Sequence, residues 1–143
     1  MEKDIVDYSN HETVSRIPPG VLAYIGDAVY ELYVRESLIK SCVGGGQSDL
    51  DLDKLHNEAV LRVCATAQAR AFADLESYFT ADEADVARRA RNIKAGRGPR
   101  SMPVIDYRYS TGFEAVIGYL YLCGRDGRLK EIMERALNAM EVQ

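Results

Sequence analysis

Apolar residues recur at helical spacing along most of the chain, and segments rich in proline or glycine separate the stretches. The first stretch follows Pro18-Pro19-Gly20 and runs to about Lys40, because proline is tolerated in the first turn of a helix. Glycines at 44–46 then interrupt the pattern. This spacing predicts a long first helix, whose apolar positions are Leu22, Ile25, Val29, Leu32 and Tyr33.

A second helix is predicted after this break, with Asp49 or Asp51 as its cap. Its buried stripe would consist of Leu52, Leu55, Ala59, Val63, Ala67 and Ala71. Thr80-Ala81-Asp82-Glu83 fits the capping box that opens a third helix, in which the Thr and Glu side chains each accept a backbone N–H. We expect this helix to end in a loop at the glycine-rich residues 96–100.

The last third of the chain predicts two more helices. One spans about Thr111 to Leu122, and the other follows a turn at 124–127. The second of these carries an apolar face made by Leu129, Ile132, Met133, Ala136 and Met140. No part of the sequence alternates apolar and polar residues with a period of two over a useful length. We therefore expect an all-α domain over residues 1–143.

Length and composition fit a globular domain. A chain of 143 residues can bury one core, and 47% hydrophobic with 28% charged residues is ordinary for such a domain. The net charge of −4 argues against a uniformly basic surface for nucleic acid. It does not exclude a local basic patch, because affinity for phosphate depends on the charges that touch it.

Compartment is indicated by the start of the chain and by its cysteines. No apolar run is long enough to span a bilayer, and residues 1–4 are too acidic and polar to begin a signal peptide. Cys42, Cys64 and Cys123 are odd in number and lack close CxxC spacing. We therefore expect a reduced, cytoplasmic protein without a membrane partner.

Two acids stand in apolar, helix-forming surroundings, Asp27 within 22–31 and Glu114 within 109–118. An acid among helix-packing residues must be neutral, paired or bound to a cation. Brought together, the two would form an oxygen-rich site suited to Mg²⁺. The histidines, His11 and His56, are too few and too far apart for a zinc site.

Each acid also has a purely structural interpretation. Asp27 could point to water while Gly26, which costs about 1 kcal/mol in a helix interior, admits a neighbouring helix. Thr111-Gly112-Phe113-Glu114 fits a capping box, and spacing alone favours this cap. For the functional interpretation, Gly118 leaves room beside Glu114, and a helix N-terminus would keep the Glu114 carboxylate ionised.

Basic residues accumulate between Val86 and Ile105, where there is no acid. They are Arg88, Arg89, Arg91, Lys94, Arg97 and Arg100. Such a run is often only a solvated helix face and loop. We favour a phosphate-binding surface, because arginine forks and the amides of a glycine-rich loop fit phosphodiester oxygens. Tyr107, which follows the loop, is the tyrosine expected near a ligand.

Together these segments resemble the ribonuclease III family. Residues 23–28, Ala-Tyr-Ile-Gly-Asp-Ala, resemble the signature helix of its catalytic domains, Glu-Phe-Leu-Gly-Asp followed by Ala or Ser. Residues 113–118 resemble their second acidic helix, Asp-x-x-Glu-Ala-hydrophobic-hydrophobic-Gly. The compact branch, Mini-ribonuclease III, matches best, because its basic Arg-Asn-x-Lys-x-Gly stretch (91–96) and its Tyr-Arg-Tyr-Ser-Thr-x-Phe-Glu-Ala motif (107–115) occur in the same order. The likeness runs from about Pro19 to Leu137.

The resemblance implies a helical bundle of the ribonuclease III type that acts as a homodimer with one active site per protomer. Asp27 and Glu114 would be catalytic and would hold Mg²⁺, with Mn²⁺ as a substitute. The substrate implied is double-stranded RNA, in particular the 23S ribosomal RNA precursor, with a large-subunit ribosomal protein as a candidate partner. The RNA-binding residues would be Arg88, Arg89, Arg91, Asn92, Lys94, Arg97, Arg100 and Tyr107.

The departures from the family pattern leave an alternative open. Ala23 stands at the signature glutamate and Thr111 at the aspartate of the second motif, as the compact branch also shows. Asp27 and Glu114 are then the motif acids left for chemistry. No double-stranded-RNA-binding domain is expected after the helices, so the catalytic domain would grip RNA alone. The alternative is a non-catalytic RNA-binding or helical interaction module with the same fold.

Overall fold

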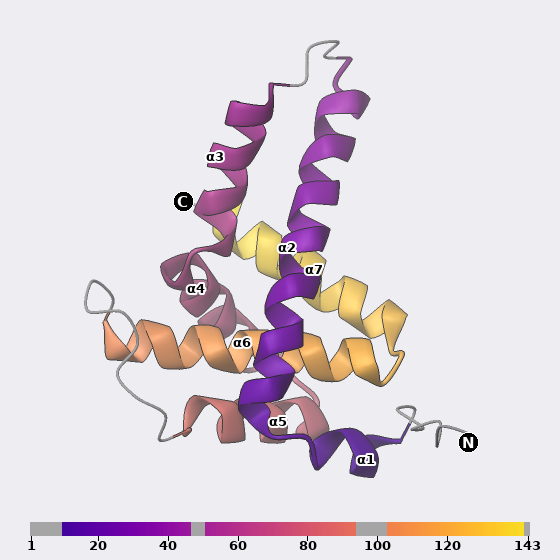
Figure 1. The fold of residues 1–143 in the computed structure, drawn as a ribbon, viewed down its shortest axis with the longest axis vertical. Coiled ribbons are helices and arrows are strands. Elements are labelled where there is room, and N and C mark those ends of the chain that lie inside the picture. The colour runs from indigo at the N-terminus through magenta and orange to yellow at the C-terminus, as the bar shows by residue number, and fades with distance from the viewer. Residues whose placement is uncertain (1–9, 47–50, 94–102, 142–143) are drawn as a thin grey trace, which may run out of the picture.

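The computed structural model describes residues 10–46, 51–93 and 103–141, and these form seven α-helices without a strand (Figure 1). The all-α prediction is confirmed. Within this part of the chain no helix is long and apolar enough to cross a bilayer. The helices are α1 (His11–Ser15), α2 (Pro19–Gly44), α3 (Leu52–Val63), α4 (Ala65–Leu75), α5 (Ala81–Arg91), α6 (Val104–Leu122) and α7 (Asp126–Glu141).

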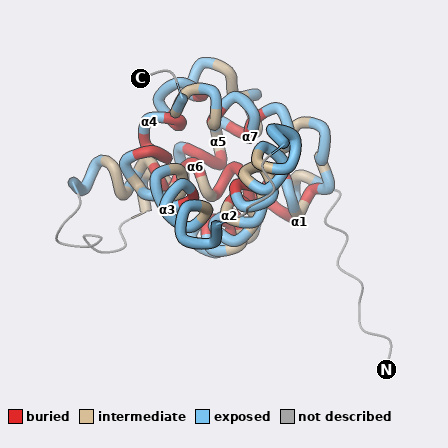
Figure 2. Tube along the Cα trace, turned by 90° about the horizontal axis from the view of Figure 1, so that it is seen from above, coloured by how far each residue is buried: buried red, intermediate tan, exposed pale blue. Residues whose placement is uncertain are grey.

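Helix α6 is the centre of the packing. It crosses the lower half of the long helix α2 and lies against α4 and α5 (Figure 1). Figure 2 shows buried residues along α6, surrounded by helices whose outer faces are exposed. Phe113 of α6 meets Tyr30 of α2 edge to face, with ring centroids 4.9 Å apart. Buried aromatic pairs prefer this edge-to-face arrangement, so the contact stabilises the packing of α6 on α2.

The beginnings of two helices follow from local sequence signals. Helix α2 begins at Pro19 as predicted, and it extends to Gly44 rather than Lys40. The capping box at Thr80 is confirmed: its side chain accepts the Glu83 N–H at 3.3 Å, and the Glu83 carboxylate accepts the Thr80 N–H at 3.0 Å. Helix α1, with Asn10 as its cap, was not predicted.

The predicted second helix is wrong as a single element, because the chain breaks at Cys64. This residue is extended, with φ −66° and ψ 153°, and separates α3 from α4. Apolar spacing continues across the break, but the two halves have different partners: α3 packs on α2, and α4 packs on α6. The break therefore serves tertiary packing and carries no proline or glycine that would reveal it.

The predicted start of the fourth helix, at Thr111, is also wrong. Helix α6 begins at Val104, directly after Pro103. Thr111 lies two turns inside it, and its hydroxyl donates to the Tyr107 carbonyl at 2.9 Å. Thr111 is therefore not a helix cap, and Glu114 is in the helix interior, away from the favourable N-terminal end.

Candidate functional site

Two glycines let the backbones of α2 and α6 touch. A Cβ atom on Gly26 would lie 1.7 Å from the Glu114 carbonyl oxygen, and one on Gly118 would lie 2.0 Å from the Leu22 carbonyl oxygen. No side chain fits at either distance, so only glycine permits this crossing. The close approach expected at Gly26 and Gly118 is confirmed. It places Asp27, the next residue of α2, beside Glu114.

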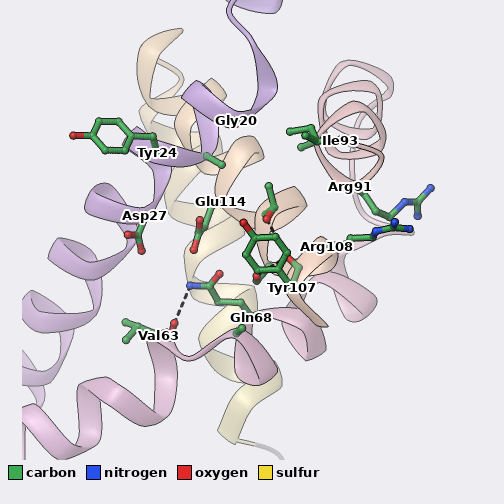
Figure 3. Close-up of a pocket in the computed structure, with 15 residues that line it drawn as sticks. Gly20, Tyr24, Asp27, Val63, Gln68, Arg91, Ile93, Tyr107, Arg108 and Glu114 are labelled. Atoms are coloured by element: carbon green, nitrogen blue, oxygen red, sulfur yellow. Dashed lines mark hydrogen bonds between the residues drawn. The ribbon is translucent and has the colours of Figure 1, made fainter. Parts of the chain in front are cut away.

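Asp27 and Glu114 line one cavity of about 500 Å³ between α2, α4, α5 and α6. Figure 3 shows the two carboxylates directed into the same space from neighbouring helices. The Asp27 residue is exposed, whereas Glu114 is half-buried. The structure thus brings together two acids that are far apart in the sequence, and it leaves one of them open to solvent.

Burial raises the pKa of Glu114 to about 8, and the neighbouring charge of Asp27 adds to this shift. Glu31 contributes in the same direction, while the amide of Gln68 opposes it. The expectation that a helix N-terminus keeps Glu114 ionised is therefore wrong, because Glu114 lies in the interior of α6 and is half-buried. A cation between the two acids would instead supply the charge that ionises Glu114.

The donors at this site fit a hard divalent cation. Two carboxylates from different helices face one space, and a buried amide oxygen, Gln68 Oε1, lacks a hydrogen-bond partner in the described part of the chain. Mg²⁺ is usually bound by one or two carboxylates and keeps several waters. Among residues 10–46, 51–93 and 103–141, no cluster of three or more His, Cys, Asp or Glu side chains could hold a metal. Asp27 and Glu114 are the acids that line the cavity.

The structure places the predicted RNA-binding residues in different surroundings. Arg91 and Tyr107 line the cavity with the acids. Arg91 also pairs with Glu76 at 3.0 Å. Asn92 is exposed at the end of α5 and does not line the cavity. Lys94, Arg97 and Arg100 lie outside the described residues.

Arg88 and Arg89 form ion pairs with a neighbouring acid and do not line the cavity. Both pair with Asp85, at 2.9 and 3.1 Å respectively. Arg89 also donates to the Ser15 carbonyl at 3.0 Å, which joins α5 to the end of α1. Asp85 precedes the acid-free run by one turn, and the structure shows that it pairs with the first two arginines of that run.

Two residues of the cavity were missed. Arg108 of α6 is exposed beside Tyr107 at the cavity, and it could have been noticed as the arginine of the Tyr-Arg-Tyr motif. Gln68 of α4 lies in the cavity wall at 1% exposure. Its only sequence signal is a polar residue between Ala67 and Ala69 on an otherwise apolar face.

Comparison of the sequence with known protein families matches the part of the chain that forms this site. The ribonuclease III domain matches residues 20–125, which include both acids and the cavity residues. The chain therefore belongs to the ribonuclease III family. A crystal structure of a Fusobacterium nucleatum protein shares the fold, with a TM-score of 0.74 and 26% identity over 86% of this chain and 93% of that one.

Within the family, the chain is similar to proteins named Mini-ribonuclease 3. The one from Thermoanaerobacter sp. (strain X514) is 39% identical over 99% of both chains. The one from Symbiobacterium thermophilum is 42% identical, over 87% of this chain and 92% of that protein. The resemblance seen in the motifs is confirmed, and it extends over nearly the whole chain.

Proposed function

We propose that the protein is an Mg²⁺-dependent endoribonuclease that cleaves double-stranded RNA in the cavity containing Asp27 and Glu114. The observation that carries the proposal is the convergence of these two carboxylates with Arg91, Arg108 and Tyr107 around one cavity. Acids that can hold a cation and arginines that can bind phosphate are the groups needed to cleave a phosphodiester. Membership of the ribonuclease III family supports the same chemistry.

The residues divide this work by their chemistry. Asp27 and Glu114 would hold Mg²⁺, and Mn²⁺ offers similar oxygen chemistry. When bound, the cation supplies an activated water and stabilises charge on the phosphoryl and leaving 3′ oxygens, which leaves a 5′-phosphate product. Arg91 and Arg108 would hold the phosphates beside the acids. Glu114 must lose its proton first, because its pKa of about 8 keeps it largely neutral near pH 7.

A homodimer through α2 is the second part of the proposal. Three apolar side chains on this helix, Val21, Tyr24 and Leu32, are 52%, 83% and 68% exposed. Their spacing of three and eight residues places them on one side of the helix. Exposed apolar surface of this extent favours a protein partner. A two-fold axis along this face would give two cavities, one for each strand of an antiparallel duplex.

The substrate proposed is the 23S ribosomal RNA precursor in the cytoplasm, with a large-subunit ribosomal protein as a candidate partner on it. Similarity to Mini-ribonuclease 3 proteins supports this choice. A-form RNA presents 2′-hydroxyls and phosphates in a shallow groove, so recognition would rest mainly on duplex shape. Lys94, Arg97 and Arg100 remain proposed RNA contacts, together with Asn92. Arg88 and Arg89 would contribute only if RNA replaced their pairing with Asp85.

The deciding experiment uses an end-labelled RNA duplex with Mg²⁺. Wild-type protein should cleave it, whereas Asp27→Asn and Glu114→Gln should bind the duplex without cleaving it. A matched control is Glu134→Gln on α7, an exposed acid remote from the cavity. Binding without cleavage by wild type would instead identify a non-catalytic RNA-binding module with this fold. Cleavage-end mapping on total precursor RNA would then test the ribosomal substrate.

A further inference from the structure

One buried amide in the cavity wall is not accounted for by packing. Gln68 of α4 is 1% exposed and lines the same cavity as Asp27 and Glu114. Its nitrogen donates to the Val63 carbonyl at 3.0 Å, but its oxygen is buried without a partner in the described part of the chain. A buried acceptor without a partner has lost its hydrogen bonds to water and gained none in exchange, which destabilises the folded state. An apolar side chain would avoid that cost, so the amide indicates a ligand at this place.

The break between α3 and α4 determines which end of the amide is free. Val63 is the last residue of α3, and Cys64 is extended. A carbonyl oxygen only accepts hydrogen bonds, so it must face the Gln68 nitrogen. Exchanging the two ends of the amide would put two acceptors against each other. The oxygen is therefore the unpartnered atom in this orientation.

Gln68 also lies next to one of the two acids. Figure 3 shows its side chain beside Glu114, with the nitrogen directed to Val63. The two groups are close enough for the Gln68 amide to influence the Glu114 carboxyl group. Asp27, Glu114 and Gln68 come from α2, α6 and α4, so the oxygen-bearing side chains approach the cavity from three helices.

We propose that Gln68 is a positioning residue of the divalent-cation site, with its amide oxygen accepting a hydrogen bond from a water that the cation holds. This inference rests on the proposed function, because Asp27 and Glu114 must hold that cation. Mg²⁺ usually keeps several of its waters, and those waters need acceptors. Outer partners of this kind are typically worth 10–100-fold in metal affinity.

The test measures cation affinity rather than cleavage. Mn²⁺ binding is followed by the electron paramagnetic resonance signal of the free ion, and Mg²⁺ binding by calorimetry. The variants are Gln68→Met, which is similar in size, and Gln68→Glu. Both remove the N–H that Val63 accepts, whereas Gln68→Glu keeps a side-chain oxygen and also adds a negative charge that favours a cation. We expect Gln68→Met to bind the cation about 10–100-fold more weakly than wild type, and Gln68→Glu to bind at least about tenfold more tightly than Gln68→Met.

Melting of each metal-free variant in a chelator checks folding. If Gln68→Met does not fold, Gln68→Glu decides alone, and an affinity below that of wild type overturns the inference. Equal affinity in wild type and Gln68→Met also overturns it. Glu114→Gln distinguishes a failure of the role proposed for Gln68 from a failure of the proposed function. If it loses the cation while Gln68→Met retains wild-type affinity, only the role of Gln68 fails. If wild type binds no cation, the proposed function fails with it.

Discussion

The Glu114 carbonyl oxygen occupies the space where Gly26 would carry a Cβ atom, at 1.7 Å from its ideal position. This contact between α2 and α6 makes the site, because the residue after Gly26 is Asp27 and the side chain of Glu114 faces the same cavity. The contact that allows the two helices to cross therefore also brings the two acids to one cavity.

Gly26→Ala should destabilise the protein strongly, because a methyl group would push the two backbones apart. Overpacking of this kind costs about 1–3 kcal/mol and more where backbone must move. The measurement is the free energy of unfolding in urea. Gly127→Ala is the matched control, since nothing lies within 4 Å of its Cβ position in α7. Alanine there should be neutral or stabilising by up to about 1 kcal/mol. Equal stability of the two variants would contradict the crossing.

Metal-free Glu114→Gln should be more stable than wild type above pH 8. The pKa of Glu114 rises from 4.5 to about 8 on folding, so the folded state favours the protonated form. Wild-type stability from this group is complete below pH 4.5 and is lost as pH rises through about 8. Each pKa unit corresponds to about 1.4 kcal/mol. Melting curves in a chelator across this range measure the effect, with Glu134→Gln as the exposed control. Parallel pH profiles for wild type and Glu114→Gln would disprove it.

Much of the fold could be predicted because its signals are local. Pro19 and the Thr80–Glu83 capping box each act within a single helical turn. The local sequence is therefore enough to predict where these two helices begin. Thr111 and Glu114 match the same capping pattern but lie inside α6, because Pro103 starts that helix earlier. A four-residue pattern cannot distinguish a helix cap from a helix interior. Pro103 was the stronger signal for where this helix begins.

The site could be predicted less completely, for tertiary reasons. Asp27 and Glu114 could be singled out because each lies among apolar, helix-forming residues, and the family motifs around them favoured a shared metal site. Gln68 could not, because the break at Cys64 that orients it depends on how α3 and α4 pack, and no local signal marks it. Likewise the pairing of Arg88 and Arg89 with Asp85 shows that a basic run in sequence need not be a free basic surface.

Binding of Mg²⁺ should release protons below pH 8. Glu114 is largely neutral there, and it must ionise to hold a cation. Calorimetry in two buffers with different ionisation enthalpies should give different apparent heats at pH 7, and the difference should shrink by pH 9. Cation affinity should rise with pH until Glu114 is ionised. Heats that are independent of the buffer would show that Glu114 is not a ligand.

Arg108→Ala should weaken duplex binding and reduce its dependence on salt. The Arg108 side chain is exposed at the cavity with the two acids, so a phosphate of the bound RNA would reach it. Removing one phosphate contact lowers the slope of log affinity against log salt by about one. Filter binding at several salt concentrations, with a cleavage-inactive background, measures this slope. Lys130→Ala on α7 is the control, because it removes a charge far from the cavity. The same slope in both variants would place the RNA surface elsewhere.

Leu32→Glu should separate the proposed dimer without unfolding the protomer. Leu32 is 68% exposed on α2, so a charge there meets water in the monomer but would be buried between two copies. Sedimentation velocity at micromolar concentration should show a dimer for wild type and a monomer for Leu32→Glu. Cleavage of both strands should fall more steeply with dilution than cleavage of either strand alone, since each protomer contributes one pair of Asp27 and Glu114. Tyr121→Glu, on the exposed side of α6, is the control and should remain dimeric. A wild-type monomer at this concentration would contradict a mechanism in which two sites act on one duplex.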